Sequence, residues 1–408
     1  MRKILILGAG NHQVHLISKA KEMGLFTVVI SPDGDYPGLA MADKVCYSDV
    51  RQLDACLKIA KSENIEGVVY DQGDVFVRTG AYIAEQLGLP GIGSEAAELF
   101  TDKYQMREKC DELCLPSIEH ALVYDLNGAL SFYRKLQGDA IIKPVDSAGS
   151  RGVSKITSET DLCDKFPEAL SYSGSGGVII ERFIKGREFE VDSLVFDGKC
   201  REMMYGELNE FSLPDVFACT TIIFPASCDE ESAEALLSYN KQLIEGFGLK
   251  QGLAHAEYIQ DEITGQFYLL EAAARGGGLY ISSHVAQLQT GIDTAEFLIK
   301  LALGELEEMP SFNTKLCHCG YVSFYLPVGE IVSMEGLDDA LAMPFVTKSL
   351  IHARLGITTT AYSDKRLRNV IFLKADTREE LNGYIDTIRQ TVKIKVQTNS
   401  GLSGPIWF

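Results

Sequence analysis

A predicted hairpin with two facing acids constrains this chain most. Two apolar-rich runs, residues 253–260 and 266–274, flank a turn-like Asp-Glu-Ile-Thr-Gly segment. This pattern predicts two antiparallel strands joined by a tight turn. Pairing centred near Thr264 sets Glu257 directly opposite Glu271.

The facing carboxylates indicate a cation. Like charges across a sheet repel, so a folded protein tolerates them when one carboxyl is protonated or when a cation lies between them, and oxygen ligands suit Mg²⁺. Side chains alternate along a strand, so His255 shares a face with Glu257, and Arg275 shares a face with Glu271. The same charges would also fit the solvated face of an ordinary edge hairpin.

Length and charge narrow the class of protein. At 408 residues the chain suggests two or three domains. Its formal net charge of −19 argues against nucleic acid or an anionic membrane as the main partner. The first apolar run is too short for a signal sequence or a membrane span, so we expect a cytoplasmic protein. The cysteines form no C-x-x-C pair, which indicates neither disulfides nor a zinc site.

The first region, residues 1–93, has the alternating pattern of a parallel α/β domain. Short apolar runs at residues 4–7, 27–30 and 67–70 alternate with amphipathic segments at 14–23, 53–63 and 75–87. Gly8 and Gly10 after the first run, with Asp33 further on, imitate a dinucleotide-binding fingerprint, but Gln13 stands where a third glycine would be. NAD binding stays an alternative, and a substrate loop at the strand ends is favoured.

Two further regions follow. Residues 94–310 begin with a helical stretch and continue with antiparallel-looking strands, and residues 311–408 form a C-terminal part with strands near 321–326 and 370–374 and a helix around 377–391. No linker rich in proline or glycine separates the first two regions, and no internal repeat is visible.

Two lysines are candidates for binding phosphate. Lys103 lies at the predicted start of a helix, where a cation opposes the helix dipole and therefore needs an anion. Lys143 ends an apolar run and precedes a loop of small residues that includes Ser147, Ser150 and Gly152. Such a loop can fold its backbone N–H groups over phosphate oxygens, although it would also suit a flexible hairpin tip.

A third candidate segment combines acids with an aromatic residue. Glu181 ends a predicted buried strand, Phe183 follows it, and Glu188 begins the next run after a glycine. This arrangement can present a backbone edge to a purine and a carboxylate to ribose hydroxyls.

The order of these motifs resembles the ATP-grasp family. A lysine, a Lys-Pro with a glycine loop, Glu-x-Phe-x-x-Gly-x-Glu, and paired glutamates followed by Arg-Gly-Gly occur in register over residues 1–305. The resemblance implies a mixed α/β and α+β ATP-grasp fold with an N-terminal parallel α/β domain and a C-terminal extension. Residues 115–185 would then form the small lid and residues 186–310 the ATP lobe.

The resemblance also implies roles for individual residues. It assigns Lys103 and Lys143 to the phosphates, Glu181 and Phe183 to adenine, Glu188 to ribose, Glu257 and Glu271 to magnesium, and Arg275 to an acyl phosphate, with His255 and Lys143 also near the chemistry. Ala273 replaces the usual asparagine ligand of the family's Glu-x-Asn-x-Arg motif. Together with His-x-Glu at 255–257, this departure points to the L-amino-acid ligase branch and leaves the number of metal ions open.

The expected function is therefore ATP-dependent ligation of a carboxylate to an amine, with an amino acid as a substrate. ATP would activate the carboxylate as an acyl phosphate, and ADP and phosphate would be released. The expected cofactors are ATP and Mg²⁺, with Mn²⁺ as an alternative ion, and the partners are small molecules rather than nucleic acid or membranes. A homodimer stays open. Alternatives are a carbamoyl-phosphate-synthetase-like or carboxylase-type enzyme, an NAD-dependent oxidoreductase, and a nucleotide-binding regulatory protein without turnover.

Overall fold

The computed structural model describes residues 1–213, 216–313, 316–359 and 367–408. The chain divides into two compact units. Unit 1 consists of residues 1–120, 190–205 and 228–314, and unit 2 consists of residues 121–189, 206–227 and 315–408. Strands β9 (Gly186–Phe196) and β10 (Lys199–Glu210) contribute residues to both units.

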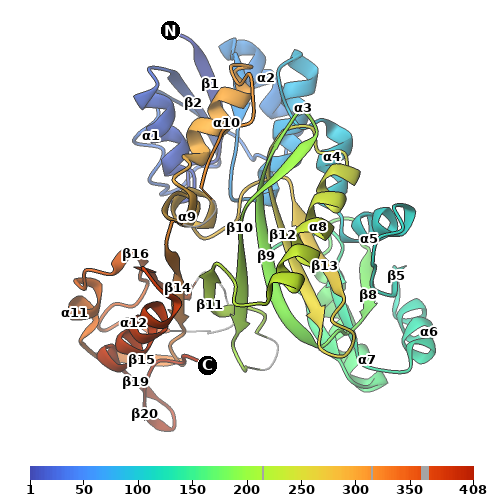
Figure 1. Ribbon diagram of the computed structural model, residues 1–408, viewed down its shortest axis with the longest axis vertical. Coiled ribbons are helices and arrows are strands. Elements are labelled where there is room, and N and C mark those ends of the chain that lie inside the picture. The colour runs from blue at the N-terminus through green and yellow to red at the C-terminus, as the bar shows by residue number, and fades with distance from the viewer. Residues whose placement is uncertain (214–215, 314–315, 360–366) are drawn as a thin grey trace. The chain divides into compact units, whose positions relative to one another are not determined.

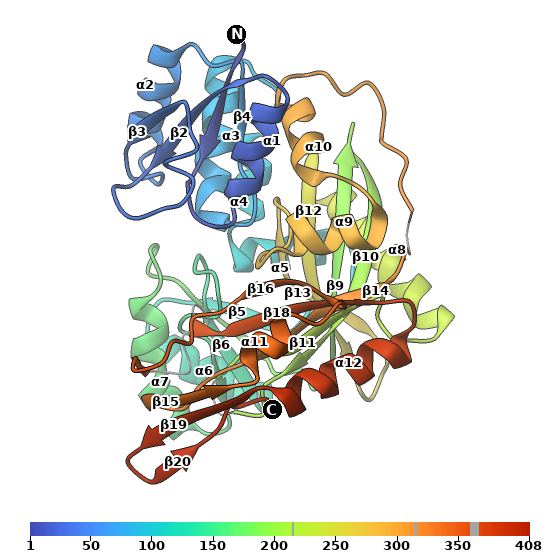
Figure 2. The same ribbon diagram turned by 90° about the vertical axis from the view of Figure 1, so that its left-hand side faces the viewer.

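Unit 1 begins with a parallel sheet in the strand order β3-β2-β1-β4 (Figure 2). Its strands are β1 (Lys3–Leu7), β2 (Phe26–Ser31), β3 (Lys44–Tyr47) and β4 (Gly67–Val69). Helices α1 (Val14–Glu22), α2 (Leu53–Glu63), α3 (Val77–Leu87) and α4 (Ser94–Leu99) accompany them, with a 3₁₀ turn at Asp74–Phe76. Since parallel strands are covered on both faces, β1 and β2 are almost continuously buried. The predicted α/β region is confirmed, but β3 was not predicted because its exposed, half-polar sequence lacks an apolar run.

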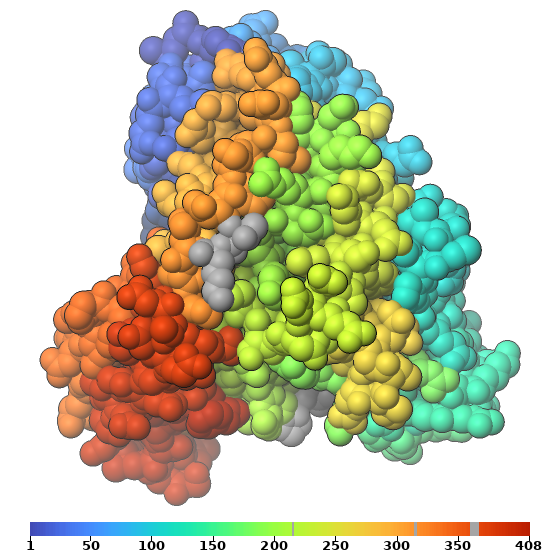
Figure 3. Space-filling view, viewed as in Figure 1, coloured from blue at the N-terminus to red at the C-terminus, as the bar shows by residue number. Residues whose placement is uncertain are grey.

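The hairpin of unit 1 consists of β12 (Gly252–Asp261) and β13 (Phe267–Ala273), and β12 lies next to β9 (Figure 1). Helix α8 (Glu230–Gly246) packs on these strands, where the hydroxyl of Tyr258 donates to Oδ1 of Asn240 at 2.9 Å. The opposite side of α8 forms part of the molecular surface in Figure 3. The remaining helices of unit 1 are α5 (Lys103–Glu112), the π-helical turn Ile281–Val285, α9 (Ala286–Thr290) and α10 (Thr294–Ala302).

Unit 2 contains a sheet in the order β5-β8-β6-β7, built from β5 (His120–Val123), β6 (Ala140–Pro144), β7 (Ser154–Ile156) and β8 (Val178–Arg182). Helices α6 (Leu126–Leu136) and α7 (Glu159–Ser171) pack on it and bury a shared apolar core. Asp125 and Ser158 cap the two helices by accepting bonds from the backbone N–H groups of Gly128 and Asp161.

The C-terminal part of unit 2 is also α+β. Its strands are β11 (Cys219–Phe224), β14 (His318–Phe324), β15 (Gly329–Glu335), β16 (Val346–Leu350), β17 (Thr358–Thr359), β18 (Asn369–Ala375), β19 (Lys393–Thr398) and β20 (Gly401–Ser403), with helices α11 (Leu337–Leu341) and α12 (Arg378–Thr391). Thr377 and Glu380 form a capping box that fixes the start of α12. The expected strands and helix of this region are present. Among the described residues, no helix combines the length and apolar character needed to span a membrane.

Candidate active site

The facing glutamates occur as the sequence predicts. In the antiparallel pairing of β12 and β13, Glu257 is directly opposite Glu271, and His255 is opposite Ala273. The turn is fixed by Asp261, whose Oδ1 accepts bonds from the backbone N–H groups of Ile263 at 2.8 Å and Thr264 at 2.9 Å. The hairpin therefore holds two carboxylates on one face of unit 1.

Lys103 supplies a cation to this pair. Its ammonium group lies 2.8 Å from Oε1 of Glu271. Asp102 caps the first turn of α5 by accepting a bond from the N–H of Gln105 at 2.9 Å, which places Lys103 at the first helical position. Arg107 on the same helix donates to the carbonyl oxygen of Leu270 at 2.8 Å, so α5 is held against β13 at two points. The anion beside Lys103 is thus the carboxylate of Glu271.

Arg275 forms a fork-like pair with an acid that sequence reasoning missed. Its Nε lies 3.0 Å from Oδ1 of Asp74 and its Nη2 lies 3.2 Å from Oδ2. Burial opposes both charges, but their attraction prevails, so the pKa of Asp74 is lowered and that of Arg275 is raised. The guanidinium expected to face an acyl phosphate is held in place by Asp74.

The loop after Arg275 is anchored by a buried carboxylate. Asp71 accepts a bond from the N–H of Gly276 at 2.9 Å and another from the hydroxyl of Ser282 at 2.8 Å, and it lies 3.3 Å from Nε2 of His15. Burial would raise the pKa of Asp71, but these partners outweigh it and lower the pKa. A Cβ at Gly276 would lie 2.2 Å from Oγ of Ser282, so close packing of the chain on itself requires this glycine.

His255 joins two acids on the same face as Glu257. Its Nδ1 lies 3.3 Å from Oδ1 of Asp192, and its Nε2 lies 3.5 Å from Oε1 of Glu257. Asp192 also accepts a bond from the N–H of Gly277 at 3.0 Å. Burial works against a charged imidazole, but the neighbouring acids outweigh it and hold the pKa of His255 well above its usual value.

Glu190 is a second acid that sequence reasoning missed. It lies on β9 and is 1% exposed, and one of its carboxylate oxygens lies within 4.8 Å of a ring nitrogen of His255 and of a carboxylate oxygen of Glu257. Burial raises the pKa of its carboxyl. Glu190 and Asp192 continue the alternation that starts at Glu188, and this spacing of two was a signal that could have identified them.

The candidate residues of unit 2 form a separate group. The ammonium group of Lys143 on β6 lies 2.8 Å from Oε2 of the fully buried Glu181 on β8. The ring of Phe183 lies under the ammonium group of Lys155, 4.1 Å from the ring centroid. Glu188 is half-buried beside Phe189 on β9. Each of the two expected phosphate-binding lysines is thus held by a glutamate of its own unit.

The small-residue loop after Lys143 has the backbone that glycine permits. Ser150 has a φ of 57° and Gly152 a φ of 72°, both in the left-handed region. A Cβ at Gly152 would lie 2.9 Å from Cγ of Pro144, so this position requires glycine. Asp146, the residue before Ser147, accepts bonds from the N–H groups of Gly174 at 3.1 Å and Ser175 at 2.8 Å. These bonds connect the base of the loop to the turn that contains Gly174 and Ser175.

The N-terminal glycines serve packing. Gly8 has a φ of 90°, and a Cβ there would lie 2.6 Å from Cζ of Phe76. Gln13, in place of a third glycine, donates to the backbone oxygen of Asp71 at 3.0 Å. Asp33 is exposed. The loop that contains Gly8 and Gln13 therefore contacts the segment that carries Asp71 and Asp74.

Comparisons with known proteins show a partial family match and a shared fold. Residues 136–283 match the family model described as the ATP-grasp domain. The fold is similar to that in the crystal structure of an L-amino acid ligase from Bacillus licheniformis, with a TM-score of 0.83. The two chains are 20% identical in sequence, and the match covers 98% of this chain and 99% of that one. It also resembles the biotin carboxylase domain of a 2-oxoglutarate carboxylase from Hydrogenobacter thermophilus, at 19% identity and a TM-score of 0.75, over 98% of this chain and 91% of that one.

Among curated proteins, the carbamoyl phosphate synthase large chain of Clostridium perfringens is 23% identical over 82% of this chain. The match covers only 31% of that protein, so the chain spans about a third of this relative's length. The likeness at these identities establishes the fold.

Proposed function

We propose that this chain, whose residues 136–283 match the ATP-grasp domain model, is an ATP-dependent ligase that joins a carboxylate to an amine, with an amino acid among its substrates. ATP would transfer its γ-phosphoryl group to a carboxylate oxygen, and the amine nitrogen would then attack the acyl carbon. Phosphate leaves with the electrons of the broken C–O bond, and the nitrogen loses one proton. The products are an amide, ADP and phosphate.

The observation that carries this proposal is the pair of opposed glutamates with a lysine on one of them. Glu257 and Glu271 are opposite each other, and Lys103 lies 2.8 Å from Glu271. Both carboxylates are partly exposed, at 40% and 32% of their side-chain surface, so an ion can reach them. Two carboxylates, completed by water and phosphate oxygens, suit Mg²⁺, so the residues fit this ion. Glu257 and Glu271 would hold it.

When bound, magnesium supplies charge neutralisation of the transferring phosphoryl group. The positive side chains of Lys103 and Lys143 would also neutralise charge on the phosphoryl group. Lys103 and Lys143 are nearly buried, and each is held by a glutamate within its own unit. A phosphate oxygen would compete with that glutamate for the ammonium group. The lysines are thereby kept ordered before the nucleotide arrives, which lowers the entropy cost of binding it.

Arg275 has the shape for a second anion. A guanidinium can present two parallel N–H groups on more than one edge, and Asp74 holds the edge formed by Nε and Nη2. A phosphate or carboxylate would contact the edge formed by Nη1 and Nη2. We assign Arg275 to the charge that builds on the acyl phosphate. Asp74 would act as a positioning residue that fixes the guanidinium plane.

Bicarbonate is the second candidate for the carboxylate substrate. The similarity to a carbamoyl phosphate synthase large chain favours it, since that name implies a carbamoyl phosphate product. The amine acceptor would then be ammonia or another small amine. The same residues would serve this reaction.

Screening for products tests both candidates. Purified protein is incubated with ATP-Mg and pools of amino acids, other carboxylates, bicarbonate and amines, and ADP and phosphate are measured. We expect release only when a carboxylate and an amine are present together. Release of AMP and pyrophosphate, or full turnover without an acceptor, would contradict the proposal. A fluorescence titration with NADH distinguishes a ligase from an NAD-dependent oxidoreductase. We expect ATP-Mg to bind and NADH not to bind.

A further inference from the structure

We propose that Glu190, His255 and Glu257 bind a divalent transition-metal ion in unit 1, without any need for nucleotide. The three side chains come from β9 and β12, and their ligand atoms all lie within 4.8 Å of one another. An imidazole nitrogen with two carboxylate oxygens favours ions such as Mn²⁺ or Zn²⁺ over Mg²⁺, which prefers oxygen ligands.

The distance between two of the ligand atoms fits one ion. Nε2 of His255 lies 3.5 Å from Oε1 of Glu257. Two ligands that are each about 2.1 Å from a metal and subtend a tetrahedral angle are roughly 3.4 Å apart. The nitrogen and the oxygen are therefore already spaced as two ligands of the same ion.

The orientation of His255 is fixed as in metal-ligating histidines. A histidine that binds a metal through one ring nitrogen usually donates the other N–H to a carboxylate or carbonyl. Nδ1 of His255 lies 3.3 Å from Oδ1 of Asp192, and Asp192 is itself held by the N–H of Gly277 at 3.0 Å. Nε2 is thereby directed toward Glu257.

Glu190 is an independent observation that points to a cation in the cluster. It is 1% exposed, and its Oε1 has no hydrogen-bond partner among the residues that the structure describes. A buried carboxylate oxygen without a donor is costly, and a cation would satisfy it. The nearby cations are engaged elsewhere, since Lys103 pairs with Glu271 and Arg275 pairs with Asp74.

Charge in the cluster also favours a metal ion. Three acids, Glu190, Asp192 and Glu257, surround the single imidazole of His255. Buried acids are usually paired with a cation or coordinate a metal ion, and a divalent ion would supply positive charge near all three.

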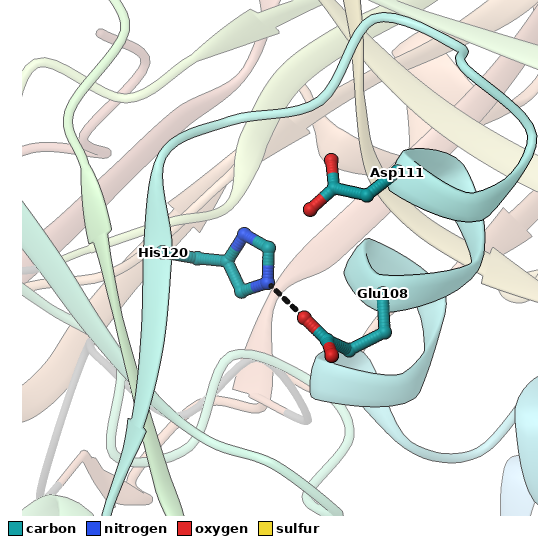
Figure 4. Close-up of side chains that lie close together, drawn as sticks. All are labelled: Glu108, Asp111 and His120. Atoms are coloured by element: carbon teal, nitrogen blue, oxygen red, sulfur yellow. Dashed lines mark hydrogen bonds and ion pairs between the residues drawn. The ribbon is translucent and has the colours of Figure 1, made fainter.

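A second cluster of two acids and one histidine provides the contrast. Glu108 and Asp111 on α5 lie beside His120 at the start of β5 (Figure 4). Here both acids are exposed, and both ring nitrogens of His120 have partners, the carbonyl oxygen of Ile118 at 2.8 Å and Oε1 of Glu108 at 3.2 Å. This cluster lacks a buried acid with an unsatisfied oxygen. It carries no proposal and serves as the control.

The proposed site shares one residue with the magnesium pair of the proposed function and differs from it in the others. Glu257 belongs to both sets, whereas Glu190 and His255 belong only to the transition-metal site and Glu271 only to the magnesium pair. Replacement of Glu271 should therefore impair ligation but leave metal binding in the absence of nucleotide unchanged. The two proposals can fail separately.

Titration with Mn²⁺ tests the site. The full-length protein is stripped with a chelator and titrated with Mn²⁺ without nucleotide, and free Mn²⁺ is followed by electron paramagnetic resonance. We expect one saturable site, coupling of the bound ion to a ¹⁴N nucleus, and weaker binding by at least tenfold in Glu190→Gln. Asp192→Asn, which weakens the contact that orients His255 and leaves the three proposed ligands in place, should weaken binding by about 10- to 100-fold. Glu108→Gln and Glu271→Gln should bind as the wild type does.

Circular dichroism and thermal unfolding of each variant show whether it is folded. If Glu190→Gln is unfolded, His255→Asn provides the same test, because it should abolish the nitrogen coupling. Absence of saturable Mn²⁺ binding by the wild type would overturn the proposal. So would wild-type affinity in folded Glu190→Gln, absence of nitrogen coupling in the wild type, or loss of binding in Glu108→Gln.

Discussion

The ammonium nitrogen of Lys103 lies 2.8 Å from Oε1 of Glu271, although 168 residues separate them in the chain. Lys103 begins helix α5 and Glu271 lies on β13, so this pair joins a helix start to the hairpin. It also gives one of the two opposed carboxylates a counter-charge before any metal or nucleotide binds.

Lys103→Met should destabilise the protein by roughly 1–3 kcal/mol, because it leaves Glu271 opposite Glu257 without its cation. The side chain of Lys103 is 8% exposed, whereas that of Glu271 is 32% exposed, so solvent limits the cost. Urea unfolding measures the change. The matched control is Lys109→Met on the same helix, which removes an exposed pair with Glu112 and should cost under about 1 kcal/mol. Equal effects of the two variants would show that the Lys103–Glu271 pair contributes nothing special.

Replacing either acid of the hairpin, Glu257 or Glu271, should slow the release of ADP. Glu257→Gln and Glu271→Gln should each lower the rate of ADP release by roughly 10²-fold, since each removes charge that would hold magnesium. Glu271→Gln should also lower the melting temperature, because Lys103 loses its partner. Steady-state kinetics over a range of Mg²⁺ concentrations and thermal unfolding check both effects. Glu262→Gln, in the exposed turn of the same hairpin, is the control, and unchanged rates in both site variants would remove the metal pair from the proposed function.

Arg275→Ala should lower turnover by about 10²- to 10³-fold while the dissociation constant of ATP changes little, because the proposed interaction forms in the transition state. Arg275→Lys should recover only part of the activity, since a point charge cannot reproduce the two-pronged contact. Turnover and ATP binding are measured on the same preparations. Arg51→Ala, at an exposed arginine paired with Asp49, should behave as the wild type does. Near-normal turnover of Arg275→Ala would mean that Arg275 only neutralises Asp74.

Asp74 should make stability sensitive to acid. The pKa of its carboxyl is lowered in the folded protein, mainly by Arg275 acting against burial, so the folded state binds this proton less readily than the unfolded state. Its contribution to stability is present above the unfolded pKa and is lost as the pH falls from about 5 toward the folded pKa. Asp74→Asn should be less stable at pH 7, by roughly 2 kcal/mol, and its stability should fall less steeply in acid. Urea unfolding at a series of pH values gives the free energy of unfolding of the wild type and of Asp74→Asn. If this free energy changes with pH in the same way for both proteins, Asp74 does not contribute to the acid sensitivity.

The local pattern of the sequence predicted much of the fold. The hairpin pairing of Glu257 with Glu271 follows from alternation and turn position, both of which lie within one short segment. Helices α2 and α12 begin and end close to the predicted residues, because periodicity and capping are local properties. The mixed α/β architecture that the motifs implied matches the fold of the solved L-amino acid ligase structure.

What the sequence could not predict depends on distant contacts. Asp74 and Arg275 are 201 residues apart, and no local pattern indicates that they meet. The burial of Glu190 likewise depends on how β9 packs beside β12. Lys143 illustrates the same point, since its partner Glu181 lies on a neighbouring strand whose register is set by the whole sheet.

Oxygen-isotope transfer tests the central claim most directly. A carboxylate substrate identified by the product screen is labelled with ¹⁸O in its carboxyl group and incubated with ATP-Mg, the amine and the protein. Because an acyl phosphate passes one carboxylate oxygen to the departing phosphate, we predict one ¹⁸O atom in the released inorganic phosphate, detected by its isotope shift in ³¹P NMR. Unlabelled phosphate, or label recovered in AMP, would contradict the account.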